Sequence, residues 1–101
     1  GCAYAQHDLG FMYYYGKGVI QSDEKAFEWY EKAADQGLKE AQYNLGCMYE
    51  EGQGVAQIDE KAVEWFAKAA EQGHKASQNY FLEILKKVLK CMIDYWNQVN
   101  K

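Results

Sequence analysis

The chain has 101 residues, of which 49% are hydrophobic and 16% aromatic, and it contains nine glycines and no proline. This composition is too apolar and too aromatic for intrinsic disorder, and the lack of proline excludes collagen and Pro-rich linkers. No stretch approaches the ~20 consecutive apolar residues that a membrane-spanning helix needs. We therefore expect a folded domain without a membrane span.

The charge is unevenly distributed along the chain. The formal net charge is −4, and all eleven basic residues are lysines. Residues 1–74 hold six lysines against thirteen acidic residues (−7), whereas residues 75–101 hold five lysines against two acidic residues (+3). Nucleic-acid-binding surfaces are usually basic and contain arginine, so we expect no nucleic-acid partner. The acidic body favours a protein partner of basic or mixed charge.

An internal repeat organises the sequence. Residues 5–40 align without a gap with residues 41–76, at an offset of 36 and with 22 of the 36 positions identical. The glycines fall into register with this offset: Gly1, Gly37 and Gly73; Gly10 and Gly46; Gly16 and Gly52; Gly18 and Gly54. Because repeat proteins are built from such units, the glycines mark fixed points of a recurring structure.

Each unit is predicted to form two helices. In the first unit, apolar residues at helical spacing predict a helix from Ala3 to Tyr15, and the two glycines that follow in residues 16–18 end it. Asp23, like Asp59 in the second unit, is positioned to cap the next helix, which in the first unit ends at Gly37 as a left-handed residue. A glycine such as Gly10, inside the first helix, costs about 1 kcal/mol relative to alanine. We expect a neighbouring helix to approach closely there.

The third copy departs from the pattern. It keeps the start of a unit with Ser77, Gln78 and Phe81, but the glycine positions hold Leu82, Val88 and Lys90. With no helix breaker after residue 73, residues 75–100 are predicted to form one helix of about 26 residues. Its apolar stripe is Phe81, Leu85, Val88, Met92, Tyr95 and Val99. Two interpretations stay open: a helix that caps the repeats, or one that forms a homodimer or binds a partner helix.

The repeated residues resemble the Sel-1-like repeat, a relative of the tetratricopeptide repeat. They are Ala5, Leu9, Gly10 and Tyr13; Gly16, Gly18 and Val19; Asp23, Lys25 and Ala26; Trp29, Tyr30, Lys32, Ala33 and Ala34; Gln36 and Gly37. The set recurs from residue 41 to residue 73. The resemblance implies an all-α, right-handed α/α solenoid of helix-turn-helix repeats. Its units would be residues 1–37, residues 38–73 and a degenerate third repeat or capping helix at 74–101.

The positions that change between the two copies mark a candidate binding face. The differing pairs in the first helix of each unit are Tyr4/Glu40, His7/Tyr43, Asp8/Asn44, Phe11/Cys47, Tyr14/Glu50 and Tyr15/Glu51. Their spacing places them on one side of the helix. In tetratricopeptide-like solenoids the first helix lines the concave groove, so the resemblance places this face there. The candidate partner-binding residues are Tyr4, His7, Phe11, Tyr14, Tyr15, Tyr43, Glu50, Glu51 and Tyr80. The alternatives are that these are ordinary exposed residues, or that Tyr4 and Phe11 pack on an upstream helix.

No constellation in the sequence indicates catalysis or metal binding. The cysteines, Cys2, Cys47 and Cys91, form no CxxC pair, and neither His7 nor His74 has a metal-ligand or triad spacing. We therefore expect no enzyme, no cofactor and no metal. An odd number of reduced cysteines favours the cytoplasm, whereas removal of a leader would leave the periplasm or secretion open.

The resemblance also implies a function. Repeats of this family serve as adaptors or scaffolds, and in bacteria they also occur in host-interaction factors and in immunity proteins. The sequence therefore predicts a module that binds a protein or peptide through the concave face of its first helices. A bacterial immunity protein that neutralises a cognate toxin by binding, and a self-associating structural segment, are the alternatives. Glu50 and Glu51 would suit a basic toxin cleft.

Overall fold

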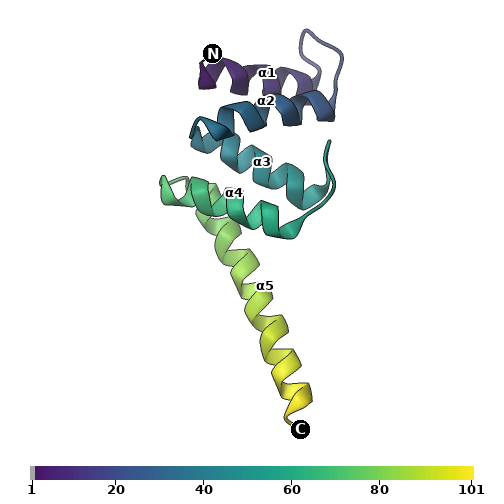
Figure 1. Ribbon diagram of the computed structural model, residues 1–101, viewed down its shortest axis with the longest axis vertical. Coiled ribbons are helices and arrows are strands. Elements are labelled where there is room, and N and C mark those ends of the chain that lie inside the picture. Colours follow the sequence, from purple (N-terminus) through teal and green to yellow (C-terminus); the bar gives the residue numbers. More distant parts are fainter. Residues whose placement is uncertain (1) are drawn as a thin grey trace.

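The computed structural model describes residues 2–101, and all secondary structure within them is helical (Figure 1). The helices are α1 (Ala3–Tyr15), α2 (Asp23–Asp35), α3 (Lys39–Glu51), α4 (Asp59–Glu71) and α5 (Lys75–Val99). The predicted bounds of the first helix agree with α1, and the predicted long helix agrees with α5 to within one residue. Gly1, which the repeat places in register with Gly37 and Gly73, lies outside the described residues.

The helices form two hairpins followed by one long helix. α1 packs on α2 and α3 packs on α4, while α2 contacts α3 and α4 contacts α5. Figure 1 shows the four shorter helices stacked in chain order, with the C-terminal half of α5 running away from the stack. The molecule is accordingly elongated, measuring 58 × 26 × 17 Å. The predicted all-α arrangement of paired helices with a long C-terminal helix is confirmed.

The two glycines inside the first helices allow close packing within each hairpin. A methyl group at Gly10 would stand 2.7 Å from Cδ1 of Tyr30, and one at Gly46 would stand 2.8 Å from Cε1 of Phe66. Both aromatic rings are buried, with 3% and 0% of their residues' surface exposed. The close approach expected from the helix-interior glycine is therefore present in both hairpins, and it offsets the conformational cost of glycine.

The predicted role of the aspartates as helix caps is wrong. Asp23 and Asp59 are the first helical residues of α2 and α4, and the N-cap positions are occupied by Ser22 and Ile58. The Ser22 hydroxyl accepts a hydrogen bond from the backbone N–H three residues later, at 3.2 Å, whereas Ile58 has no side-chain group to offer. Each aspartate instead accepts a hydrogen bond from the glutamine two residues before it, at 2.7 and 2.6 Å. Both carboxylates still lie at the positive end of a helix.

A glutamine at the same position of each unit joins successive repeats. Gln42 of α3 is 5% exposed, and its Nε2 donates to the carbonyl of Ala34 in α2 at 3.2 Å. Its Oε1 accepts from Nε2 of Gln72 at 2.9 Å. One repeat later, Nε2 of Gln78 donates to the carbonyl of Ala70 at 3.2 Å. The same polar contact therefore sets how α3 docks on α2 and how α5 docks on α4.

The apolar core ends at the start of α5. The buried apolar residues are Ala26, Tyr30, Ala33, Ala34, Leu38, Ala41, Leu45, Met48, Ala62, Phe66 and Ala69. In α5 the only described residue that is fully buried is Ser77, and every residue from 85 to 99 is exposed. Only the first turns of α5 therefore cover α4, and the remainder of the helix stands clear of the repeats.

Candidate binding groove

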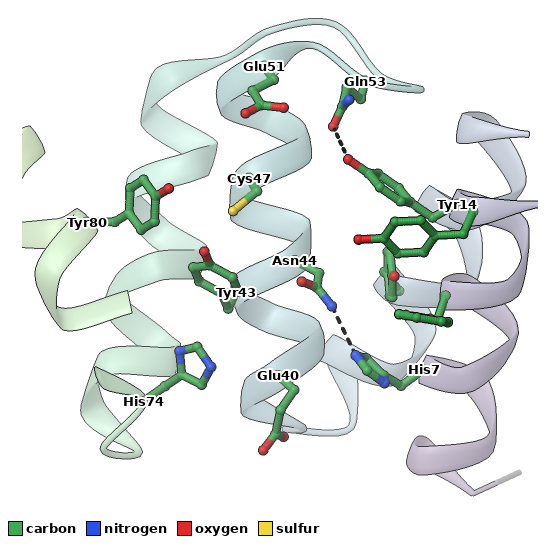
Figure 2. Close-up of a pocket in the computed structure, with 13 residues that line it drawn as sticks. His7, Tyr14, Glu40, Tyr43, Asn44, Cys47, Glu51, Gln53, His74 and Tyr80 are labelled. Atoms are coloured by element: carbon green, nitrogen blue, oxygen red, sulfur yellow. Dashed lines mark hydrogen bonds between the residues drawn. The ribbon is translucent and has the colours of Figure 1, made fainter. Parts of the chain in front are cut away.

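The changed faces of the first helices border a hollow of about 500 Å³ between α1, α3 and the start of α5 (Figure 2). Because these three helices occupy equivalent places in successive repeats, equivalent positions face the same side of the stack. The predicted residues that line this groove are His7, Phe11, Tyr14, Tyr15, Tyr43, Glu51 and Tyr80. Seven of the nine candidate partner-binding residues therefore border one hollow in the described part of the chain.

Tyr43 lies at the centre of the groove. Its ring centroid is 4.8 Å from that of His74 and 5.8 Å from that of Tyr80, which joins α3 to the α4–α5 turn and to α5. The Tyr80 ring in turn stacks on the buried ring of Phe66 at 5.4 Å. Burial, followed by a hydrogen bond with Cys47, raises the pKa of the Tyr43 hydroxyl. The hydroxyl therefore stays protonated at neutral pH and can donate a hydrogen bond.

The wall contributed by α1 is held to α3 and to the turn after it by two hydrogen bonds, which Figure 2 shows as dashed lines. The Tyr14 hydroxyl donates to Oε1 of Gln53 at 3.1 Å, and Asn44 Nδ2 lies 3.0 Å from His7 Nε2. Tyr15, which packs its ring 4.9 Å from that of Tyr14, remains 58% exposed. In the groove, the hydrogen-bonded side chain of Tyr14 therefore lies beside the largely exposed ring of Tyr15.

The groove is lined by acidic and aromatic side chains. Glu40 and Glu51 lie near opposite ends of α3, and Figure 2 shows both beside the hollow. None of the lining residues in the described part of the chain is a lysine. At the edge, the Lys17 ammonium lies 5.2 Å from the centroid of the Phe11 ring, which is 39% exposed. The rings here can therefore accept a cation on their faces.

Burial shifts the pKa values of two further groove side chains, Cys47 and His74. Burial raises the pKa of the Cys47 thiol to about 11, with Glu50 and Glu51 adding to the rise and the Tyr43 hydrogen bond opposing it. A protonated thiol is a poor nucleophile. Burial lowers the pKa of His74, partly opposed by the carboxylate of Glu40. Among the described residues, no group of three or more histidine, cysteine or acidic side chains is arranged to hold a metal ion.

Two of the predicted site residues lie outside the groove. Tyr4 is 67% exposed on α1 and does not line the hollow. Glu50 lines a different hollow, between the N-terminal end of α4 and α5. Its neighbour Glu51 does face the groove, because successive residues of a helix point about 100° apart. An acidic pair in the sequence is therefore divided between two surfaces.

The groove also contains residues that were not among the candidate partner-binding residues, although three of them, Glu40, Asn44 and Cys47, belong to the changed helical face. The full set is Tyr30, Glu40, Asn44, Cys47, Gln53 and His74. Gln53 follows the end of α3 and His74 precedes α5, so neither belongs to the helical face that was compared between units. Both nevertheless differ from their counterparts one repeat earlier, Lys17 and Leu38. Applying the same comparison to the turns would have found them.

Comparison with known proteins agrees with this geometry. The family model described as Sel1 repeat matches residues 3–38 and again residues 39–74. The chain belongs to the Sel1 repeat family. The two matched units each comprise one helical hairpin, α1–α2 and α3–α4. The resemblance noted in the sequence is thereby confirmed, and Sel1 repeats are generally protein-interaction modules.

Solved structures include similar chains from bacteria. A Sel1 repeat protein from Oxalobacter formigenes shares 43% identity at a TM-score of 0.77, over 78% of this chain and 32% of that one. The protein c5321, a protective antigen of uropathogenic Escherichia coli strains that displays an SLR fold, shares 47% identity at a TM-score of 0.74, over 75% and 16%. Cysteine rich protein B of Helicobacter pylori shares 28% identity at a TM-score of 0.75, over 77% and 59%.

The chain spans about a third or less of the first two of these proteins and 59% of the third. A search of the curated proteins gives no match. Within the described residues, no helix has the length and hydrophobicity to cross a membrane.

Proposed function

We propose that this Sel1 domain is an adaptor or scaffold module whose groove binds a segment of another protein. The observation that carries the proposal is the distribution of sequence change between the first two repeats. The residues that pack the hairpins together, such as Gly10 and Gly46, are the same in both, whereas those lining the hollow differ. Positions freed from packing are available for recognising a specific partner.

The chemistry of the groove favours a segment that presents a basic side chain. Exposed tyrosine and phenylalanine rings provide contact area at low entropic cost, as in many protein-binding sites. Glu40 and Glu51 border these rings, and the lining contains no lysine to compensate them. A lysine or arginine side chain would meet ring faces and a carboxylate together. An adaptor and an immunity protein that covers a basic active site would both use this chemistry.

The proposal is tested by selecting binders from a random peptide library displayed on phage, with the whole chain as bait. We expect the selected peptides to share a lysine or arginine flanked by apolar residues. Tyr15→Ala should weaken their binding at least about tenfold, since exposed aromatic anchors dominate such interfaces. Tyr4→Ala is the matched control, because it removes an exposed tyrosine from the same helix but outside the groove.

Glu51→Gln separates the contribution of the carboxylate charge to peptide affinity from the contribution of the aromatic rings. It should reduce the affinity of basic peptides and leave unchanged the affinity of peptides in which the basic residue is replaced by glutamine. Peptides that bind the Tyr15→Ala variant as tightly as they bind the Tyr4→Ala variant would show that the groove is not the binding site.

A further inference from the structure

The solvent-facing side of α5 is an apolar surface that the repeats leave uncovered. Leu85, Val88, Leu89, Met92, Trp96 and Val99 are between 39% and 63% exposed. At about 100° per residue they form a continuous band along the last four turns of the helix. The two acidic residues of the helix, Glu83 and Asp94, lie on the opposite side of this band. A single soluble chain rarely exposes an apolar surface of this extent without a partner.

In each hairpin the second helix packs closely on the first. The second helix of a further Sel1 unit could not pack on α5 in the same way. In both hairpins the aromatic ring of the second helix lies against a glycine, Gly10 or Gly46, where a methyl group would come within 2.8 Å of the ring. The equivalent residue in α5 is Leu82, whose side chain is 54% exposed. A helix that packs here must stand further away, at the ordinary distance between two helices with large side chains.

A hollow beside α5 gives the band a second, adjoining apolar surface. Between α2 and α3, the glycine turn after α3 folds onto the start of α2, where Gly54 lies against the backbone of Asp23. Between α4 and α5 there is no such turn, because the helix continues through Val88 and Lys90 at the glycine positions. A hollow of about 470 Å³ remains there, lined by Ala62, Val63, Ile84, Val88 and Met92.

The rim of this hollow is acidic. Glu50, Asp59 and Glu60 lie along it and outnumber Lys87, the one basic residue that the described part of the chain contributes to the lining, and residues 1–74 as a whole carry an excess of seven negative charges. The segment 75–101 carries an excess of three positive charges, with Lys101 at its end. The body and the long helix of this chain are therefore complementary in charge. A helix of the same composition as α5 suits this apolar hollow with its acidic rim.

We propose that the apolar face of α5 binds a second copy of this chain, with the two α5 helices packed side by side and antiparallel. The stripe from Phe81 to Val99 has alternating spacings of four and three residues, which is the pattern of a two-helix seam. An antiparallel seam places Val88 opposite Met92 of the second copy and Leu85 opposite its Tyr95. The same register brings Trp96 of one copy to Ile84 of the other, at the mouth of the hollow.

The antiparallel arrangement is consistent with the exposed apolar surface of α5 and with the charges of the two copies, and it has closed two-fold symmetry. A standard interface buries about 800 Å² on each partner, and α5 offers six apolar side chains in the band that are each between 39% and 63% exposed. The two acidic bodies lie at opposite ends of the seam, so their repulsion is small, and the Lys101 end of each helix runs toward the acidic body of the other copy. The two-fold contact is closed, so association stops at the dimer.

Sedimentation velocity on the whole chain, at several protein concentrations, tests the proposal. We expect a species of twice the 11.7 kDa mass of one chain. Met92→Glu should weaken the dimer at least about 100-fold, because it places an unpaired charge in the centre of the seam. Asn97→Glu is the matched control: it adds the same charge to the opposite, exposed side of α5 and should leave the dimer intact. Circular dichroism checks that both variants keep their helix content.

Cysteine crosslinking tests the orientation. In a chain whose three native cysteines are replaced by alanine, Leu85→Cys and Tyr95→Cys should form a disulfide only when the two variants are mixed. A parallel pair would instead crosslink each variant to itself, since a disulfide requires Cα atoms within about 7 Å.

Three results would overturn the proposal: a monomer at every concentration, a dimer that persists in Met92→Glu, or crosslinking of each cysteine variant to itself. A monomer that binds anionic lipid vesicles through α5 would assign the apolar face to a membrane surface instead. None of these results bears on peptide binding in the groove, because Met92 lies outside it.

Discussion

The junction between α2 and α3 and the junction between α4 and α5 begin in the same way and end differently. In each, a glutamine side chain of the later helix donates to a backbone carbonyl of the earlier one, at 3.2 Å. The first junction is then completed by the glycine turn that follows α3, whereas the second continues as a straight helix and leaves a hollow. Replacement of the turn glycines therefore converts a closed repeat junction into an open surface.

The largest effect on the free energy of unfolding is expected in the glycine turn after α3, which completes the junction between α2 and α3. Gly54 has a φ of +70°, and a methyl group there would stand 2.4 Å from the carbonyl oxygen of Asp23. Gly54→Ala should therefore lower the free energy of unfolding by about 2–4 kcal/mol, from backbone strain and from displacement of the start of α2. Urea denaturation followed by circular dichroism measures this loss.

Gly73→Ala separates the contribution of backbone strain from that of the displacement of α2. Gly73 has a similar φ of +86°, but no atom lies within 4 Å of the position of a methyl group. This variant should lose only the strain component, about 1–2 kcal/mol. Equal losses in the two variants would mean that contact between the turn and α2 adds nothing to the stability of the junction.

The sequence is sufficient to predict most of this fold, because the repeat supplies two independent views of each element. An aligned pair such as Gly10 and Gly46 indicates a close approach that neither glycine would indicate alone. The position of a cap is less determined, since Asp23 and Ser22 are both good capping residues and lie next to each other. Only the structure shows that the helix begins after Ser22.

The groove residues that lie on helices could be predicted from the sequence more readily than those that lie in turns. Comparing copies selects Tyr14 and Tyr15 correctly as groove residues, because a helix has a fixed angular period. The side-chain directions of Gln53 and His74 have no such period, since both lie beyond the helix ends. The hollow beside α5 depends on the angle at which α5 leaves α4, and this angle is a property of tertiary packing.

A smaller effect is expected from the glutamine that the two junctions share. Gln42→Ala removes a buried side chain that bonds to Ala34 and to Gln72, and should lower the free energy of unfolding by about 1–2 kcal/mol. Gln78→Ala removes the equivalent bond at the α4–α5 junction, where the side chain is exposed. Its effect should be about 0.5 kcal/mol. Equal losses, measured by urea denaturation, would contradict the difference in burial between the two junctions.

The smallest effect concerns the start of α5, which depends on a neutral histidine. His74 is the N-cap residue, and its Nδ1 accepts a hydrogen bond from the backbone N–H of Ser77 at 3.2 Å. A protonated Nδ1 cannot accept this bond. Burial, opposed by Glu40 and assisted by the positive charge of Lys39, lowers the pKa of His74 from its ordinary value of 6.5.

The direction of the pH dependence follows from this shift. Near pH 6 the folded chain binds fewer protons at His74 than the unfolded chain does, so the free energy of unfolding rises with pH in that range. The stabilising contribution of the neutral cap is complete above pH 6.5 and is lost as the pH falls through the lowered pKa. The loss should be at most about 1 kcal/mol, the usual contribution of an N-cap.

His74→Asn identifies the source of this dependence, because asparagine caps a helix without titrating in this range. Urea denaturation at pH 7.5 and at pH 5.5 should show the wild-type chain losing more stability than the variant on acidification. Other groups that titrate between these values contribute equally to both proteins and cancel in the comparison. An identical pH dependence in the two proteins would show that protonation of His74 does not weaken the cap of α5.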